Sequence, residues 1–156
     1  MVDFVNYLLS KAPGTIADLD NEVRISHSSG KVSVLWKNRG IPVPSDLDQL
    51  KDFYSSYLGA SLFSSVFKIC SISDNLKRGD VKVVFSIATL QQVILDERVR
   101  FPSDSIPFMT QAGIGYYALG PDGTIHEWDT EEAALTGRFD GLCQIVDEWA
   151  MAIEQP

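Results

Sequence analysis

The sequence is poor in histidine and cysteine, and it contains no long hydrophobic run. The two cysteines in 156 residues, Cys70 and Cys143, are too few and too far apart in the sequence for a disulfide framework or a zinc site. Cys70 and Cys143 lie in apolar contexts, so we expect two buried free thiols in a reducing cytoplasm. No apolar stretch approaches the ~20 residues that cross a bilayer. The N-terminal segment from Met1 to Ser10 lacks the features of a signal peptide.

Basic side chains are nearly absent from the last third of the chain. Residues 1–100 carry 11 acidic and 12 basic side chains, a net charge of +1, whereas residues 101–156 carry 10 acidic side chains and one basic side chain, Arg138, a net of -9. The overall formal charge of -8 therefore originates in residues 101–156. Nucleic acids and anionic membranes attract clustered Lys and Arg, so we expect neither as a partner. The acidic segment is either a solvated surface or a recognition surface for a basic protein.

Common catalytic and nucleotide-binding motifs are missing from the sequence. It has no Gly-x-Ser-x-Gly elbow and no Gly-x-x-x-x-Gly-Lys-Ser/Thr phosphate loop. Gly113 and Gly115 are not followed by a predicted helix, which excludes the dinucleotide-binding fingerprint. His126 and Asp129 form a His-x-x-Asp pair, which supplies too few ligands for a metal. We therefore expect no catalytic residue, no cofactor and no bound metal.

The strongest candidates for an enzyme are four carboxylates close together in the sequence: Glu127, Asp129, Glu131 and Glu132. A glycosidase-like hydrolase needs two carboxylates about 5–10 Å apart in a cleft whose surroundings separate their pKa values. A run of acids in a charged loop provides no such surroundings. A solvated loop or a partner surface is the favoured interpretation, and the hydrolase is the least favoured.

Hydrophobic periodicity predicts one α+β domain over residues 1–156, with a mostly antiparallel sheet flanked by three to four helices. The predicted helices cover residues 4–9, 45–58, 89–94 and 142–153. The predicted strands lie at residues 23–25, 32–36, 81–87, 114–119 and 124–128 and around Phe108, and residues 62–69 form a strand or an apolar loop followed by one.

Several single residues have predicted local roles. Ser45 is placed to cap the second helix and Gly59 to end it. Thr89 and Asp140 are predicted caps of the third and fourth helices. His27 borders the predicted Ser28–Lys31 turn, where we expect a solvated loop side chain.

Two stretches resemble the SUKH superfamily, also called the Smi/Knr family. Ile41–Phe63, with the sequence IPVPSDLDQLKDFYSSYLGASLF, is similar to the family's proline entry, helix and following apolar strand. Gly113–Asp129, with the sequence GIGYYALGPDGTIHEWD, is similar to its paired strands joined through Asp-Gly. The resemblance covers roughly residues 35–155 and includes the closing helix. It departs from the family pattern at Leu58-Gly59-Ala60, which replaces an Asn-Gly step, and in the predicted hairpin at residues 22–36.

The resemblance implies an α+β fold without enzymatic activity. Bacterial members of this superfamily are mostly immunity proteins that bind and neutralise a cognate toxin, such as a nuclease or another enzyme with a basic cleft. Fungal members act as regulatory scaffolds, which is the alternative function. We expect a monomer or weak dimer whose acidic segment meets the toxin, with Trp128 as an anchor. The candidate partner-binding residues are Asp122, Glu127, Trp128, Asp129, Glu131 and Glu132.

Overall fold

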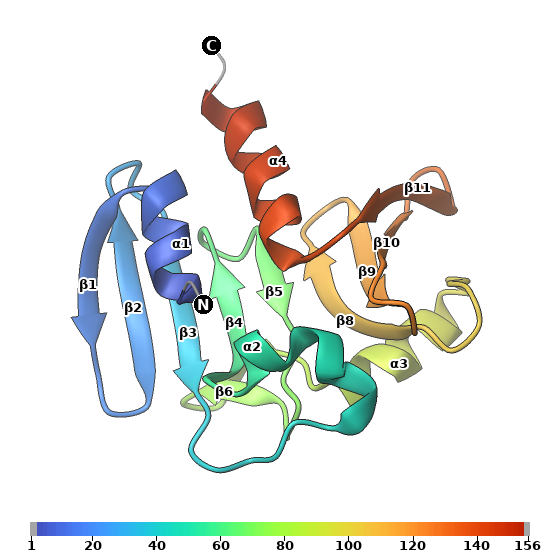
Figure 1. Ribbon diagram of the computed structural model, residues 1–156, viewed down its shortest axis with the longest axis horizontal. Helices are drawn as coiled ribbons and strands as arrows, with labels where there is room; N and C mark the ends of the chain where they lie inside the picture. Colours follow the sequence, from blue (N-terminus) through green and yellow to red (C-terminus); the bar gives the residue numbers. More distant parts are fainter. Residues whose placement is uncertain (1–2, 155–156) are drawn as a thin grey trace.

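Within residues 3–154, nine strands form one antiparallel sheet (Figure 1). The computed structural model describes the backbone of these residues and the side chains of residues 3–151. The strand order is β1-β2-β3-β4-β5-β8-β9-β10-β11, and all neighbouring strands are antiparallel. This arrangement confirms the α+β class with a mostly antiparallel sheet. The strands are β1 (Gly14–Asp18), β2 (Glu22–His27), β3 (Val32–Lys37), β4 (Tyr57–Leu62), β5 (Phe67–Ile69), β8 (Ile106–Gln111), β9 (Gly115–Leu119), β10 (Ile125–Asp129) and β11 (Ala134–Phe139).

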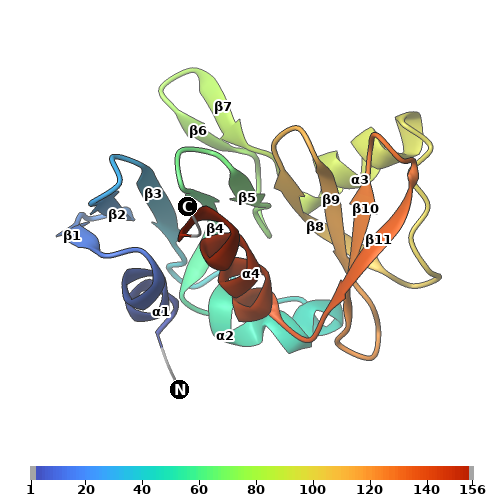
Figure 2. The same cartoon turned by 90° about the horizontal axis from the view of Figure 1, so that it is seen from above.

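Helices cover the two faces of this sheet unequally. Seen from above, α1, α2 and α4 lie on one side of the sheet, while α3 and a separate hairpin, β6–β7, lie on the other (Figure 2). No helix in the described part of the chain is long and apolar enough to cross a membrane. The bounds are α1 (Phe4–Lys11), η1, a 3-10 helix (Ser45–Leu50), α2 (Lys51–Tyr54), β6 (Leu76–Arg78), β7 (Val81–Val84), α3 (Ile87–Asp96) and α4 (Leu142–Glu154).

Two apolar clusters hold these layers together. The larger cluster fills the space between the sheet and the helices α1, η1, α2 and α4, and includes Leu8, Ile25, Tyr54 and Phe108, each with none of its surface exposed. The smaller cluster lies beneath α3 and contains Cys70, Leu90, Ile94 and Val99. The apolar stripe predicted for the last helix is correct for Leu142, Ile145, Val146, Trp149 and Ala150, whereas the side chain of Ile153 lies outside the described residues.

The helix predicted for residues 45–58 is shorter and less regular than expected. Its first turn is the 3-10 helix η1, α2 ends at Tyr54, and β4 begins at Tyr57. Gly59 therefore does not end a helix but lies within β4. A Cβ atom at this position would lie 2.7 Å from the carbonyl oxygen of Ile69, so the pairing of β4 with β5 requires glycine here.

The third helix starts earlier than predicted. Ser86 is the N-cap of α3, and its Oγ accepts a hydrogen bond from the backbone N–H of Thr89 at 3.1 Å. Thr89 is therefore inside the helix, and the strand predicted to reach residue 87 stops at Val84. For the last helix, the side chain of Gln144 accepts a hydrogen bond from the backbone N–H of Asp140 at 2.7 Å.

A left-handed turn joins β4 to β5 and positions α4. Phe63, Ser64 and Ser65 have φ values of 54°, 56° and 70°, a conformation that costs roughly 1–2 kcal/mol for each non-glycine residue. Two hydrogen bonds between Ser64 and Val32, of 2.7 and 3.0 Å, offset part of this cost. The turn directs Phe63 into the core, where its ring stacks on Trp149 of α4 with 4.0 Å between centroids.

Two predictions about polar side chains were wrong. His27 is not a solvated loop residue, because it ends β2 and only 5% of it is exposed. Of the two cysteines, Cys70 is buried as expected but Cys143 is exposed. Cys143 lies in the first turn of α4 and is not among the residues of the larger cluster.

The tyrosines predict how the fold responds to alkali. Burial is the largest cause of a raised pKa at all five tyrosines of the sequence and brings the pKa of Tyr57 to about 12. Since the unfolded value is about 10, their contribution to stability is complete below that pH and declines as the pH rises toward the folded values. We expect tyrosinate absorbance and loss of circular dichroism to rise together above about pH 10. Tyrosinate formation by most of these residues in a still-folded protein would contradict this.

Candidate functional site

The six predicted partner-binding residues are spread over β10 and the turns at its two ends. Glu127, Trp128 and Asp129 belong to β10, while Glu131 and Glu132 lie in the turn to β11. Asp122 lies in the turn between β9 and β10, at the opposite end of the strand. The structure therefore brings Asp129, Glu131 and Glu132 together and separates them from Asp122.

Glu127 and Trp128 point to opposite faces of the sheet, as expected for neighbours in a strand. The carboxylate of Glu127 accepts a hydrogen bond from the hydroxyl of Tyr117, 3.0 Å away, on the face of the larger cluster. Trp128 packs against the smaller cluster on the α3 face. The side chain of Trp128 is half-buried. One flat partner surface cannot contact both side chains.

Two of the predicted acids organise their own turns. The carboxylate of Asp129 accepts hydrogen bonds from the backbone N–H groups of Glu131 and Glu132 at 2.8 and 3.0 Å. Asp122 accepts from the backbone N–H and the hydroxyl of Thr124 at 3.0 and 3.1 Å. These bonds hold the pKa of Asp122 below its usual value. Both residues have local structural roles whether or not a partner binds.

Glu131 and Glu132 are the predicted acids with the freest carboxylates. Both side chains are exposed, and neither carboxylate makes a hydrogen bond or ion pair to another residue within the described part of the chain. We call these two residues the acidic turn. Their charges therefore face solvent.

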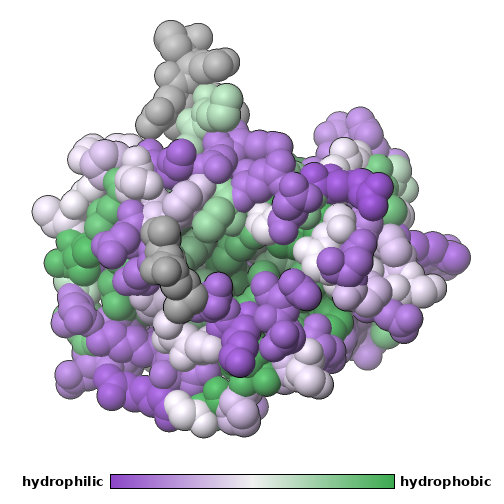
Figure 3. Space-filling view, viewed as in Figure 1, coloured by the Kyte–Doolittle hydropathy of each residue, from purple (hydrophilic) through white to green (hydrophobic). Residues whose placement is uncertain are grey.

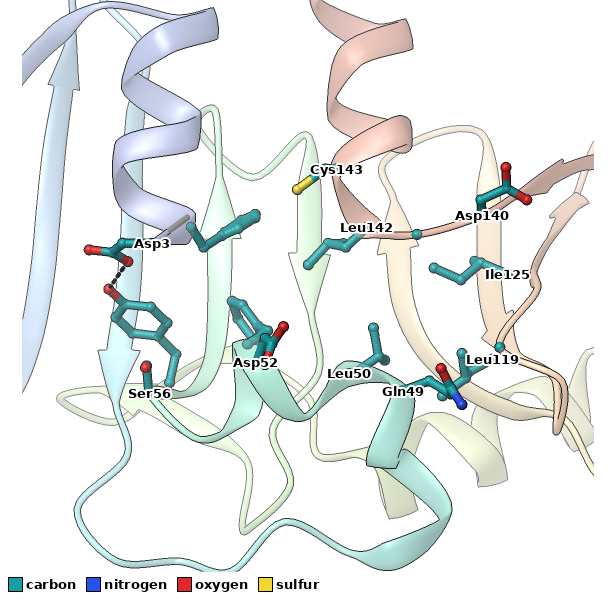
Figure 4. Close-up of a pocket in the computed structure, with 15 residues that line it drawn as sticks. Asp3, Gln49, Leu50, Asp52, Ser56, Leu119, Ile125, Asp140, Leu142 and Cys143 are labelled. Atoms are coloured by element: carbon teal, nitrogen blue, oxygen red, sulfur yellow. Dashed lines mark hydrogen bonds between the residues drawn. The ribbon is translucent and has the colours of Figure 1, made fainter. Parts of the chain in front are cut away.

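A pocket of about 560 Å³ lies beneath the N-terminal ends of α1 and α4 (Figure 4). The space-filling view shows the same region as an apolar hollow bordered by hydrophilic residues (Figure 3). The turn between β9 and β10 closes the pocket on one side, and η1 and α2 form its lower wall. Its floor consists of buried apolar side chains from six elements: Phe4, Leu50, Phe53, Leu119, Ile125 and Leu142.

The charged residues around this pocket are all acidic. Asp3 and Asp140 lie on opposite sides of it, with Asp52 of α2 between them (Figure 4). All three side chains are exposed, and no Lys or Arg lines the pocket among the residues that the structure describes. We call these three residues the acidic rim. The exposed thiol of Cys143 also lies on the pocket wall.

Asp3 contributes to local structure as well as to the rim. Its carboxylate caps α1 by accepting a hydrogen bond from the backbone N–H of Val5 at 3.2 Å, and it accepts a second bond from the hydroxyl of Tyr57 at 3.4 Å. Burial, with the neighbouring charge of Asp3 adding to it, raises the pKa of Tyr57 to about 12. This phenol is therefore a hydrogen-bond donor at neutral pH.

Sequence reasoning missed the pocket because its members are far apart in the chain. Asp3, Asp52 and Asp140 belong to three helix ends that only the packing of α1, α2 and α4 brings together. Asp3 and Asp140 precede predicted helices by one and two residues. Nothing in the sequence shows that those helices begin at one place.

The arrangement is suited to binding rather than to metal coordination. Among the side chains of residues 3–151, no group of three or more His, Cys, Asp or Glu comes close enough to hold a metal ion. An apolar floor removes apolar ligand surface from water, and the acidic rim attracts positive charge. The pocket can therefore hold a ligand that is apolar at its tip and cationic beside it.

The fold and these surfaces define an α+β protein with a nine-stranded antiparallel sheet, an acidic turn and an apolar pocket with an acidic rim. Comparison with known proteins finds no matching family model, no matching curated protein and no matching solved structure.

Proposed function

We propose that this protein is a cytoplasmic immunity protein of the SUKH type, which binds and neutralises a cognate bacterial toxin domain by direct contact and without catalysis. The observation that carries the proposal is the acidic turn, where Glu131 and Glu132 expose free carboxylates in a segment with a net charge of -9. The α+β fold and the resemblance of residues 35–155 to the superfamily support it.

The negative charge of the acidic turn explains how the protein could inhibit a toxin. A toxin that acts on nucleic acid, or another enzyme with a polyanionic substrate, presents a basic cleft. An acidic surface mimics the charge of that substrate and accelerates association by ~10–10³-fold through steering. Occupation of the cleft would block the substrate without any chemical step.

Co-expression tests the proposal. The protein is produced in a bacterial host together with the toxin domain encoded beside its own gene, and growth is compared with that of cells producing the toxin alone. We expect the protein to restore the growth of cells that produce the cognate toxin. It should not restore the growth of cells that produce an unrelated toxin. Failure to restore growth, together with a stable complex with a host protein in a pull-down, would contradict the immunity function. It would support the alternative function of a regulatory scaffold.

A further inference from the structure

We propose that the pocket beneath α1 and α4 receives an aromatic or large aliphatic side chain of the toxin, flanked in the toxin's sequence by Lys or Arg. This inference rests on the proposed function and deepens it, because it names the chemistry of the segment that the protein recognises. The acidic turn would guide the partner to the surface, and the pocket would hold it there.

The pocket has the size and lining of an anchor site. Its volume of about 560 Å³ lies within the range of ~300–1,000 Å³ typical of ligand sites, and it is large enough for a whole aromatic side chain. Phe4, Phe53 and Leu142 on the floor are already buried, so an entering side chain would meet a formed apolar surface. Interfaces take most of their binding energy from a few aromatic or Arg residues seated in such pockets.

The charge around the pocket selects against anionic ligands. The N-terminal ends of α1 and α4 point toward it, and each carries a partial charge of roughly +0.5. Asp3, Asp52 and Asp140 contribute a formal charge of -3, so about two negative charges remain after this compensation. A purely apolar ligand would leave them unmatched. A Lys or Arg next to the buried side chain places a positive charge at the rim.

The position of the pocket relative to the acidic turn favours a protein segment over a small molecule. The β9–β10 turn lines the pocket through Gly123, and the acidic turn lies at the other end of β10. Five residues of strand separate the two turns, a distance of roughly 17 Å. A standard interface of ~800 Å² per partner spans both features.

Protection of Cys143 from alkylation provides a direct readout in the unmodified protein. Burial raises the pKa of both thiols, but Cys70 is buried whereas Cys143 is exposed on the pocket wall, so iodoacetamide should modify Cys143 alone. The probe is the peptide acetyl-Lys-Arg-Trp-Arg-Lys-amide. At ~10 times its Kd it should slow alkylation, followed by mass spectrometry, by ~tenfold, because only the free protein reacts.

Two comparison peptides separate the contributions of shape and charge. Replacing the Trp of the probe by Ala keeps its charge and should raise Kd by ~10-fold or more. A Glu-Asp-Trp-Asp-Glu peptide keeps the aromatic side chain and should give no protection. Equal protection by the Ala and Trp peptides would overturn the proposal, as would the absence of protection by the Trp peptide.

Matched protein variants locate the site. Asp52→Asn/Asp140→Asn removes two rim charges and should raise the Kd of the Trp peptide by ~3–10-fold. Asp74→Asn/Asp80→Asn removes two exposed charges next to the β6–β7 hairpin, on the opposite face of the sheet (Figure 2), and should leave that Kd unchanged. An equal rise of Kd in both variants would show that the peptide is attracted generally to an acidic protein. It would overturn the assignment of the pocket as the binding site.

The toxin then distinguishes failure of this inference from failure of the proposed function. If Asp52→Asn/Asp140→Asn binds the toxin with unchanged Kd while the wild type rescues growth, the pocket assignment is wrong and the immunity function stands. If the peptide binds as expected but no toxin is neutralised, the pocket is a binding site and the immunity function is wrong.

Discussion

Replacing Glu131 and Glu132 by lysine is expected to slow association with the toxin by ~10–100-fold at low ionic strength. The double change shifts the acidic turn by four charge units, from two negative to two positive side chains, and so reverses its contribution to steering. Stopped-flow fluorescence measures the association rate constant over a series of salt concentrations. The variant should also show a flatter dependence on salt, because fewer attractive pairs remain to be screened.

The choice of residues follows from the geometry of the turn. Asp129 is left unchanged because its carboxylate accepts two backbone hydrogen bonds that hold the turn together, and a lysine there would change shape and charge at once. Asp74→Lys/Asp80→Lys is the matched control, with the same change in net charge at the β6–β7 hairpin, which lies apart from the acidic turn (Figure 2). If both variants associate at the wild-type rate, the acidic turn is a solvated surface.

The class of fold could be predicted from local patterns, because alternating strands and amphipathic helices carry their own signals. The hairpin of β2 and β3, the strands β9 and β10 and the helix α4 all lie where periodicity placed them. The error at residues 45–58 has a physical cause. Leu47, Leu50 and Tyr54 occupy helical spacing and are buried, but the pairing of β4 with β3 and β5 draws the chain into the sheet from Tyr57 onward.

The edge strands β1 and β11 gave no such local signal. Every residue of β1 is exposed, and β11 is exposed over most of its length, so neither sequence alternates between apolar and polar residues in the way that predicts a half-buried strand. Their backbones become strands because β2 and β10 offer free hydrogen-bonding groups at the two edges. Sheet pairing of this kind appears only once the neighbouring strand is in place.

Only the part of the candidate site that is local in sequence could be predicted. The acidic turn is contiguous in sequence, so its charge was visible from composition. The acidic rim joins residues 3, 52 and 140, and only tertiary packing brings them together. The distribution of charge along the sequence therefore predicted the acidic turn. Prediction of the pocket requires knowing how the helices α1, α2 and α4 pack on the sheet.

His27 belongs to a buried hydrogen-bond network that the sequence did not predict. Its Nδ1 donates to the carbonyl oxygen of Ala12 at 2.7 Å, and its Nε2 lies 2.8 Å from Oγ of Ser33. That same Oγ accepts a hydrogen bond from the backbone N–H of Phe63 at 3.0 Å. The imidazole thus connects the end of α1 to β3 and, through Phe63, to the turn on which Trp149 stacks.

Substituting His27 by Ala should lower the free energy of unfolding by ~3–4 kcal/mol. The change removes two hydrogen bonds, leaves the Ala12 carbonyl and the Ser33 hydroxyl without their partner, and opens a void beside Phe63, whose ring centroid lies 5.1 Å from the imidazole. Urea unfolding followed by circular dichroism measures the loss. Ser28→Ala, at the exposed neighbouring position, should change the value by less than ~0.5 kcal/mol.

The pair of variants separates a structural histidine from a loop histidine. If the side chain of His27 were solvated, His27→Ala and Ser28→Ala would lower the free energy of unfolding by equally small amounts. That result would contradict the claim that the hydrogen-bond network of His27 connects α1 to the β4–β5 turn. Ser33→Ala gives an intermediate test, because it deletes the one hydroxyl that joins His27 to Phe63 and should cost ~1–2 kcal/mol. A graded loss across Ser28, Ser33 and His27 is the pattern that a continuous buried network produces.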